Sequence, residues 1–345
     1  MKLATKAEFR TDIPENWVAD PDAILGNLEA LLASGINIGF IEKRSGITEE
    51  RLHALLDRKP RSKIGITAGA GHSDYLPAVR EAQELFNLQC WLNEFAAERK
   101  DQAREYTEIG TGMYISGLAM EALETKRLFH LIGGYGISKT KTLERFARMH
   151  PMTHETPGAA YLSLTDEDRT TGQVYQRISE AMRINEKFVT RGRSIGQRVR
   201  NTLRKGDLLI IDEANYAFER GTWATLRDVF DGSPASMFLV SNSTSNGFVK
   251  KHQAELGAFL TRARTRPIEK NMPADGEDYA KALGYTCPKI IEESAQMVSR
   301  SGPSGGMRFL AKAFEDAERI AAKRGVPVDI VILRDAAKLN SVFFK

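Results

Sequence analysis

The sequence predicts an α/β fold: a mainly parallel sheet with crossover helices, preceded by a small all-α domain and followed by a helical lid. From residue 108 onward, apolar runs of strand length alternate with helical patterns, which is typical of a parallel sheet. After Arg266-Pro267 the pattern becomes helical. We therefore expect a helix-turn-helix domain at 1–65, a linker and connecting helix at 66–107, the α/β core at 108–270 and the lid at 271–345.

The predicted strands of the core are Leu128–Ile132, Ala160–Leu164, Leu208–Ile211 and Ser236–Val240. Lid helices are expected at 276–283, 289–299 and 306–324, followed by a strand-like run, PVDIVIL, at 327–333.

Short helices are predicted near the N-terminus at 22–34, 37–46 and 48–59, with glycines between them. Their apolar residues would fill a small core, and Thr48 can cap the third helix. The helix-turn-helix spacing fits a DNA reader, and it fits equally well a small bundle used for packing or protein contact.

A basic, glycine-rich stretch at 58–74 is expected to be an exposed linker and a domain boundary. The amphipathic helix that follows, at 76–105, carries leucines on one side and many charges on the other. We expect this helix to pack against the segment that follows it.

Composition sets broad limits. With 345 residues, 42% of them hydrophobic, the chain can bury one large core or two smaller ones. Cys90 and Cys287 lie far apart and the histidines are scattered, so neither a disulfide framework nor a zinc site is indicated. Residues 1–20 lack an apolar signal region, and no apolar run approaches the roughly 20 residues that span a bilayer. We expect a cytoplasmic protein without a membrane partner.

The segment RLFHLIGGYGISKTKT at 127–142 carries the strongest functional signal, because an apolar strand runs into a glycine-rich turn at the start of a helix. Three glycines, Gly133, Gly134 and Gly136, allow backbone N–H groups to approach a phosphate. Lys139 can reach the β- and γ-phosphates, and Thr140 can bind Mg²⁺. The pattern G-x-x-x-x-G-K-[ST] has glycine at its sixth position, where this chain has Ser138.

A second motif, DLLIIDEAN, places Asp212-Glu213 at the carboxyl end of an apolar strand, where open α/β sheets bind ligands. Asp212 is expected to hold the Mg²⁺ shell, and Glu213 to orient and polarise the water that attacks the γ-phosphate. An acid pair in this position can also be part of a solvated loop, but after a phosphate-binding turn it is the expected partner of that turn.

Further polar residues follow the later elements. Asn242, after the fourth strand, could reach a γ-phosphate or its attacking water. The arginines of FLTRARTRPIE, predicted at the end of a helix, are either a surface face or a source of charge for a neighbouring subunit's nucleotide. They are Arg262, Arg264 and Arg266. Arg308 opens a lid helix and is either exposed or in contact with the same nucleotide in cis.

Together these elements resemble the AAA+ ATPases of the transposition family that includes the phage Mu B protein. A small helix-turn-helix, GGYGISKT, IIDEAN, LVSN, LTRARTR and GGMRFL occur in that family's order, over about residues 25–325. The resemblance implies an AAA+ P-loop NTPase core that binds ATP and Mg²⁺. It also implies that Asn242 is the first sensor, Arg262 the arginine acting in trans and Arg308 the second sensor, so that catalysis is expected from Glu213, Asn242 and Arg262.

The expected nucleotide contacts are Gly133, Gly134, Gly136, Ser138, Lys139, Thr140, Lys141 and Arg308, with Mg²⁺ on Thr140 and Asp212. By resemblance, the protein would bind double-stranded DNA with little sequence preference as an ATP-dependent homo-oligomer, a ring or helical filament. It would deliver that DNA to a transposase, in a bacterial or phage-infected cell. Two alternatives stay open: a helicase loader or replication-initiation ATPase, and a DNA-binding regulator switched by nucleotide without turnover. Ser138 is the residue that keeps the second alternative open.

A basic segment between the second and third predicted strands, EKFVTRGRSIGQRVRNTLRK, is the expected DNA surface, although a solvated helix face would have the same composition. Its basic residues are Lys187, Arg191, Arg193, Arg198, Arg200, Arg204 and Lys205, and Lys250 and Lys251 are weaker candidates of the same kind. The net charge of +4 is compatible with a nucleic-acid partner.

Overall fold

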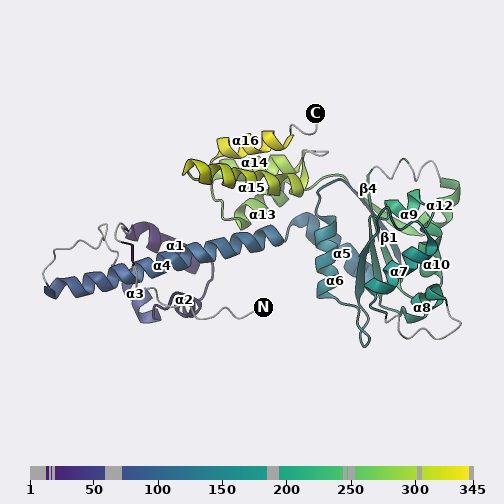
Figure 1. Ribbon diagram of the computed structural model, residues 1–345, viewed down its shortest axis with the longest axis horizontal. Coiled ribbons are helices and arrows are strands. Elements are labelled where there is room, and N and C mark those ends of the chain that lie inside the picture. The colour runs from purple at the N-terminus through teal and green to yellow at the C-terminus, as the bar shows by residue number, and fades with distance from the viewer. Residues whose placement is uncertain are drawn as a thin grey trace. The chain divides into compact units, whose positions relative to one another are not determined.

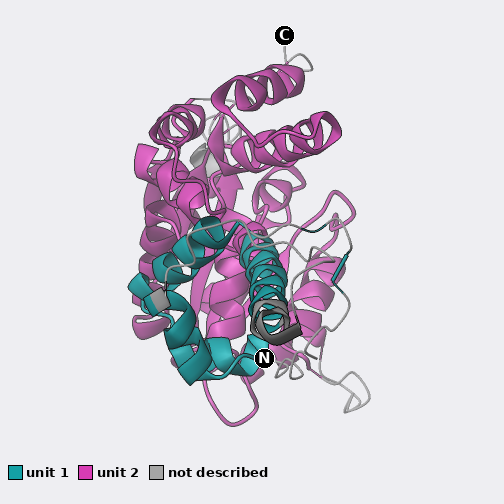
Figure 2. Ribbon diagram, turned by 90° about the vertical axis from the view of Figure 1, so that its left-hand side faces the viewer, with its two compact units in different colours: residues 1–102 teal, residues 103–345 magenta. Residues whose placement is uncertain are grey.

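The computed structural model describes residues 13, 14, 17, 20–58, 72–184, 194–243, 247, 253–300 and 305–341 (Figure 1). It divides into two compact units, residues 1–102 and 103–345, which are coloured separately in Figure 2. One helix, α4 (His72–Glu105), runs from the first unit into the second. Among the described residues, no helix combines the length and the hydrophobicity of a transmembrane span.

The first unit contains the three short helices expected from the sequence, α1 (Pro21–Ala33), α2 (Ile38–Ser45) and α3 (Glu49–Arg58). Local signals set their ends. Asp20 accepts a hydrogen bond from the backbone N–H of Ala23, and Gly46 ends α2 in the left-handed conformation.

We expected α4 to pack against the segment that follows it, and for the central leucines of α4 this prediction is wrong. Leu85 and Leu88 are fully buried in one cluster with Leu28, Ile41 and Leu52 of the preceding helices. Burial of each such side chain contributes about 1.5–3 kcal/mol, so the three short helices gain their core from α4.

In the described part of the chain, the second unit holds a five-stranded parallel sheet in the order β2-β3-β4-β1-β5. Its strands are β1 (Leu128–Gly133), β2 (Ala159–Ser163), β3 (Leu208–Asp212), β4 (Ser236–Asn242) and β5 (Ala263–Ile268). The four strands expected from the sequence are confirmed. The placement of Arg264 and Arg266 at the end of a helix is wrong, because both lie in the edge strand β5.

Helices cover both faces of the sheet (Figure 1). One face packs against α5 (Gly110–Glu124) and α6 (Lys139–Met149). The opposite face packs against α7 (Thr171–Ala181), α8 (Ile195–Thr202), α9 (Asn215–Glu219), α10 (Trp223–Asp231) and α12 (Gln253–Leu260). Burial on both faces explains why β3 and β4 appear in the sequence as continuous apolar runs.

The lid consists of α13 (Pro273–Ala282), α14 (Pro288–Val298), α15 (Gly306–Arg324) and α16 (Ile330–Ser341). Its three expected helices are confirmed, but the strand expected at 327–333 is wrong. Asp329 accepts a hydrogen bond from the N–H of Ile332 at the start of α16. Ile332, Leu333 and Ala336 follow helical spacing and are buried against α15 and α14.

Candidate nucleotide site

The turn between β1 and α6 is folded so tightly that side chains have no room on its inner side. The N–H of Gly134 donates to the carbonyl oxygen of Ile268 at 3.0 Å. A Cβ on Gly134 would lie 2.3 Å from the carbonyl oxygen of Glu269. Gly136 has φ +72°, and its carbonyl oxygen accepts from the N–H of Met307 at 2.9 Å. The glycines are therefore required by the backbone, as a phosphate-binding turn demands.

Ser138 takes the backbone conformation that glycine would take at this position. Its φ is +68°, in the left-handed region, and it directly precedes α6. For an L-residue this conformation costs about 1–2 kcal/mol. The departure from the glycine pattern therefore places a residue with a Cβ in the left-handed region, which adds local strain.

Lys139, the first residue of α6, lies within the turn. Its Nζ donates to the carbonyl oxygens of Gly133 at 2.9 Å and Gly134 at 2.7 Å. Burial lowers the pKa of Lys139, while the Asp212 and Glu213 carboxylates act in the opposite direction. The structure thus brings Lys139 and the acid pair together, as the sequence predicted.

Asp212, at the end of β3, accepts hydrogen bonds from two hydroxyl groups. Its Oδ2 accepts from Thr140 Oγ1 at 2.6 Å and from the Tyr161 hydroxyl at 2.9 Å. Burial, followed by the adjacent Asp212 carboxylate, raises the pKa of Tyr161, so its hydroxyl remains a donor. Tyr161 was not predicted from the sequence. Its contact with Asp212 depends on the pairing of β2 with β3, in which alternate residues share a face, and the sequence alone does not show that pairing.

The donor atoms at Thr140 and Asp212 fit Mg²⁺, which prefers hard oxygen ligands. No group of three or more His, Cys, Asp or Glu side chains in the described ranges could hold a metal ion by itself. A magnesium ion here would therefore take one or two protein oxygens and complete its shell with phosphate and water, which is its usual mode.

Glu213 combines backbone strain with a shifted pKa. Its φ is +51°, one of three positive values among non-glycine residues in the described ranges. Burial and then the Asp212 carboxylate raise the pKa of Glu213, and Lys139 and Arg308 partly oppose this shift. Such strain is typical of functional positions, where the surrounding structure holds a side chain in a fixed direction.

A cavity of about 450 Å³ lies beside Lys139, Thr140 and Glu213. It is lined by the turn, Glu213, Asn242 and Arg308, so the structure places both predicted sensor residues at the same cavity as Lys139. Its remaining wall comes from residues 103–109 and from the lid, including Tyr279 and Met307. This wall was not predicted from the sequence, because its residues lie far from the glycine-rich turn in the chain. The size is within the range of small-molecule sites.

Other predicted residues have different surroundings. Lys141 lines the cavity, but its Nζ donates to the carbonyl oxygens of Arg104 and Glu105 at the end of α4. Arg262 forms an ion pair with Asp231, and Arg264 forms one with Glu121. Both guanidinium groups are partly exposed, at 46% and 43% of the side-chain surface, so neither is buried within its own subunit.

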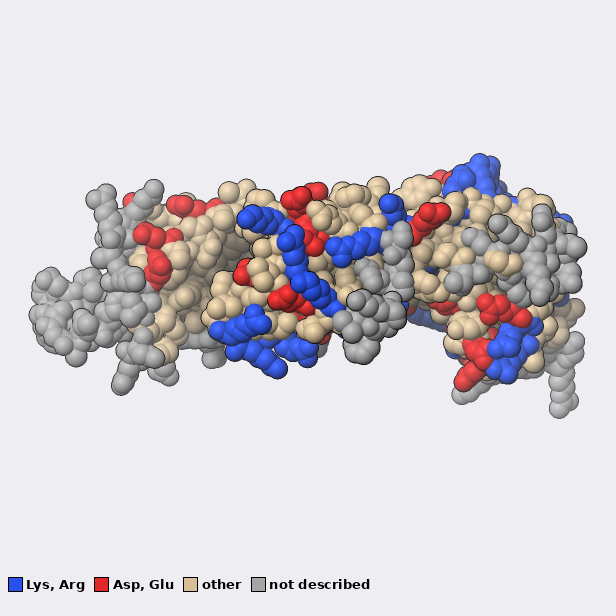
Figure 3. Space-filling view, turned by 90° about the horizontal axis from the view of Figure 1, so that it is seen from above, with Lys and Arg blue, Asp and Glu red and all other residues tan. Residues whose placement is uncertain are grey.

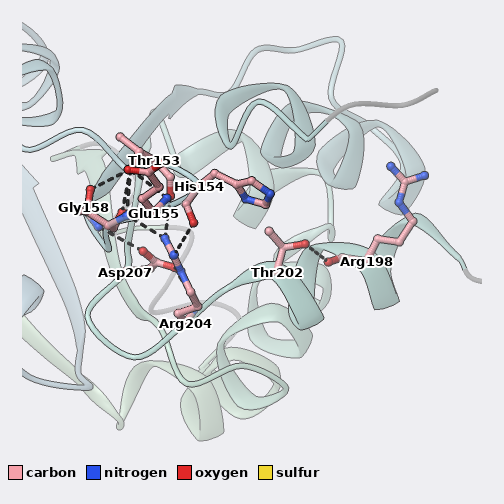
Figure 4. A network of polar contacts seen from close by, with 9 residues as sticks. Thr153, His154, Glu155, Gly158, Arg198, Thr202, Arg204 and Asp207 are labelled. Carbon is pink, nitrogen blue, oxygen red and sulfur yellow. Dashed lines mark hydrogen bonds and ion pairs between the residues drawn. The ribbon is translucent and has the colours of Figure 1, made fainter. Parts of the chain in front are cut away.

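Two of the predicted DNA-contacting arginines are engaged within the fold. Arg204 donates to the carbonyl oxygens of Thr153, His154 and Thr156 at 2.7–3.1 Å and pairs with the buried Asp207 (Figure 4). These contacts hold the loop between α6 and β2. A second arginine, Arg200, donates to the Tyr175 hydroxyl at 3.0 Å and forms an ion pair with Asp228.

The remaining members of the basic segment have different positions. Lys205 is exposed, and the Arg198 side chain points away from the network around Arg204 in Figure 4. On the face visible in Figure 3, Lys and Arg side chains lie beside Asp and Glu. The candidates Lys187, Arg191, Arg193, Lys250 and Lys251 lie outside the described residues.

Residues 122–244 match the family model described as AAA domain, which covers the glycine-rich turn, the acid pair and Asn242. The core has the AAA+ P-loop NTPase fold. The sheet order β2-β3-β4-β1-β5 and the cavity at the carboxyl ends of β1, β3 and β4 agree with this assignment.

Solved structures with similar chains include the Aeropyrum pernix ORC2 protein in ADPNP–ADP complexes, at 13% identity and TM-score 0.49, covering 67% of this chain and 67% of that chain. Domain III of the Thermotoga maritima replication initiation protein DnaA is 15% identical, with a TM-score of 0.45. The match covers 68% of this chain and 96% of that chain. The Aeropyrum pernix ORC1 protein in complex with DNA is 18% identical, with a TM-score of 0.46. The match covers 67% of this chain and 65% of that chain. The comparison with curated proteins gave no match.

Proposed function

We propose that this chain is an Mg²⁺-dependent ATPase whose nucleotide state controls assembly on DNA. The observation that carries the ATPase part is the convergence of Lys139, Thr140, Glu213, Asn242 and Arg308 on one cavity. Each has the chemistry that phosphoryl transfer from ATP to water requires, which is mainly positioning and charge stabilisation.

The roles follow from these positions. The N–H groups of the turn and the Lys139 ammonium would bind the phosphates, and Thr140 and Asp212 would hold Mg²⁺. When bound, Mg²⁺ would neutralise charge on the β- and γ-phosphates. The Glu213 carboxylate would accept a hydrogen bond, and then the proton, from the attacking water. Asn242 would orient that water, and Arg308 would stabilise phosphate charge from the lid.

We further propose that the ATP-bound form oligomerises on double-stranded DNA with little sequence preference and delivers it to a transposase. This part rests on the motif order of the sequence, which resembles the transposition ATPases. In such an oligomer Arg262 would act on the nucleotide of a neighbouring copy. Its exposed position, outside the cavity of its own subunit, supports that role.

We assign the proposed DNA contacts to the second unit. In the first unit, α3 exposes Glu49, Glu50 and Asp57, and its Arg51 is bound to the buried Glu84. Exposed carboxylates would repel a phosphate backbone, so this surface suits contact with a protein better than with DNA.

The ATPase part is tested by Lys139→Ala. Loss of the ammonium should weaken ATP binding at least about tenfold, since a charge-assisted contact contributes about 1.5–3 kcal/mol. A matched control is Lys281→Ala, which removes only a surface ion pair with Glu277. Isothermal titration with ATP and Mg²⁺ would measure both variants. Equal ATP affinity in Lys139→Ala and the parent protein would reject the assignment of this site.

A further inference from the structure

The register of β2 and β3 brings a tyrosine to the predicted metal site. Tyr161 pairs with Ile210, and Ser163 pairs with Asp212. Because alternate residues share a face, Tyr161, Ile210 and Asp212 lie on the same face of the sheet. Tyr161 also packs against the cluster that contains Ile210 and the α6 residue Phe146. A tyrosine side chain is long enough to reach the Asp212 carboxylate, two residues further along the sheet.

Asp212 accepts hydrogen bonds from one backbone N–H and two side-chain hydroxyls, which come from three separate parts of the chain. Oδ1 accepts from the N–H of Glu213 at 2.8 Å. Oδ2 accepts from Thr140 of α6 at 2.6 Å and from Tyr161 of β2 at 2.9 Å. The terminal torsion of an aspartate has a broad, shallow preference, so these donors determine where its two oxygens lie.

We propose that Tyr161 is a positioning residue for the Mg²⁺ that accompanies the nucleotide, a role that rests on the proposed ATPase function. By holding Oδ2 of Asp212, Tyr161 keeps that oxygen as the acceptor of the Thr140 hydroxyl proton. With its proton donated to Asp212, Thr140 Oγ1 would keep its lone pairs available to bind the cation. Outer hydrogen-bond partners of this kind commonly set metal affinity.

The hydroxyl group, rather than the ring, carries this role. The ring fills space against α6, and a phenylalanine at 161 would fill the same space. Tyr161→Phe therefore removes one hydrogen bond to Asp212 and leaves the packing in place. It does not touch Lys139 or the N–H groups of the turn, which would bind phosphate without metal.

The test compares Tyr161→Phe with Tyr175→Phe in the full chain. Tyr175 is a good control because its hydroxyl also donates to an aspartate, Asp228, away from the cavity. Mn²⁺ serves as the probe for Mg²⁺, and its affinity is measured by electron paramagnetic resonance with a non-hydrolysable ATP analogue. Binding of the same analogue is measured in EDTA as the metal-free reference.

We expect Tyr161→Phe to weaken Mn²⁺ affinity about tenfold, at the lower end of such effects. Analogue affinity in EDTA should not change, and Tyr175→Phe should match the parent protein in both measurements. Unchanged Mn²⁺ affinity in Tyr161→Phe would overturn the tyrosine's role while leaving the ATPase proposal standing. Weaker binding in EDTA would also overturn it, because Tyr161 would then support the turn itself. Failure of the parent protein to bind the analogue would reject both proposals.

Discussion

Glu213 is the residue where backbone strain and proposed chemistry meet. Its backbone is in the left-handed region directly after β3 ends, and Glu213 lines the cavity. Burial and the neighbouring Asp212 carboxylate raise its pKa above the ordinary value of 4.5. A raised pKa makes a carboxylate a stronger base, which suits a group that takes a proton from water.

The pH dependence of hydrolysis should report this shift. Since Glu213 must be ionised to accept a proton, the hydrolysis rate should fall as the pH drops through a value above 4.5. Glu213→Gln should keep ATP binding and lose hydrolysis by a factor of about 10²–10⁴. Hydrolysis rates across pH and ATP titrations would measure both effects. Parental hydrolysis in Glu213→Gln would remove Glu213 from the mechanism.

The same pKa shift has a consequence for stability. When the pKa of a carboxyl group is higher in the folded state than in the unfolded state, the free energy of unfolding falls as the pH rises through the two pKa values. At neutral pH the ionised Glu213 therefore lowers the free energy of unfolding, and glutamine removes this penalty. Glu213→Gln should unfold at a temperature no lower than the parent protein, which a thermal scan can check. A clear drop would mean that the charge stabilises the fold.

At the residue scale, the sequence motifs predicted most of the residues that meet at the site. Lys139, Thr140, Asp212, Glu213, Asn242 and Arg308 converge as their motifs predicted, because motif spacing reflects fixed connections between strands and helices. Tyr161 contacts Asp212 through strand pairing, which the sequence does not contain. Ser138 could be seen as a departure from glycine, but its left-handed φ depends on the folded turn.

At the scale of elements, a buried carboxylate joins the lid to the core. Asp275 of α13 accepts hydrogen bonds from the N–H and the hydroxyl of Thr111, at the start of α5. It also accepts from the Asn271 amide at 2.9 Å and the N–H of Met272 at 3.0 Å. Because a helix N-terminus attracts negative charge, α5 contributes to this joint as well.

Asp275→Ala should destabilise this joint by about 3 kcal/mol, because several buried donors would lose their acceptor. Hydrogen exchange should show faster exchange at the N–H groups of Thr111 and Met272. Asp278→Ala is the matched control, since Asp278 lies on the same helix and is exposed. Similar exchange in the two variants would show that Asp275 does not hold the joint.

Two neighbouring basic residues separate fold stability from DNA binding. Arg204→Ala should destabilise the protein by about 1.5–3 kcal/mol, since the loop between α6 and β2 loses its charged donor. Lys205→Ala should change stability by less than about 0.5 kcal/mol. If Lys205 contacts phosphate, its loss should make the plot of log DNA affinity against log salt concentration less steep, by about 1 in slope. Thermal unfolding and DNA titrations at several salt concentrations would test both variants. Equal stability in the two would contradict the contacts of Arg204.

Helices and strands with a regular spacing of apolar residues could be predicted from the sequence. Those whose conformation depends on pairing or packing with neighbouring elements could not. The lid helices carry clear helical patterns, and α15 begins and ends at the predicted residues, Gly306 and Arg324. The edge strand β5 is short, polar and arginine-rich, so its extended conformation comes from pairing with β1. Similarly, the β-branched residues that open α16 favour a strand locally, but packing against α15 makes them helical.

At the scale of the whole molecule, we propose that nucleotide binding in the second unit controls assembly on DNA. The most direct measurement is fluorescence anisotropy of a labelled duplex of arbitrary sequence, titrated with the full chain. It is made with a non-hydrolysable ATP analogue, with ADP and without nucleotide, each with Mg²⁺, and is repeated with Lys139→Ala. We expect tight, salt-dependent binding only with the ATP analogue, and no such gain in Lys139→Ala. Equal DNA affinity in all three nucleotide states, or no DNA binding in any of them, would contradict nucleotide control of DNA assembly.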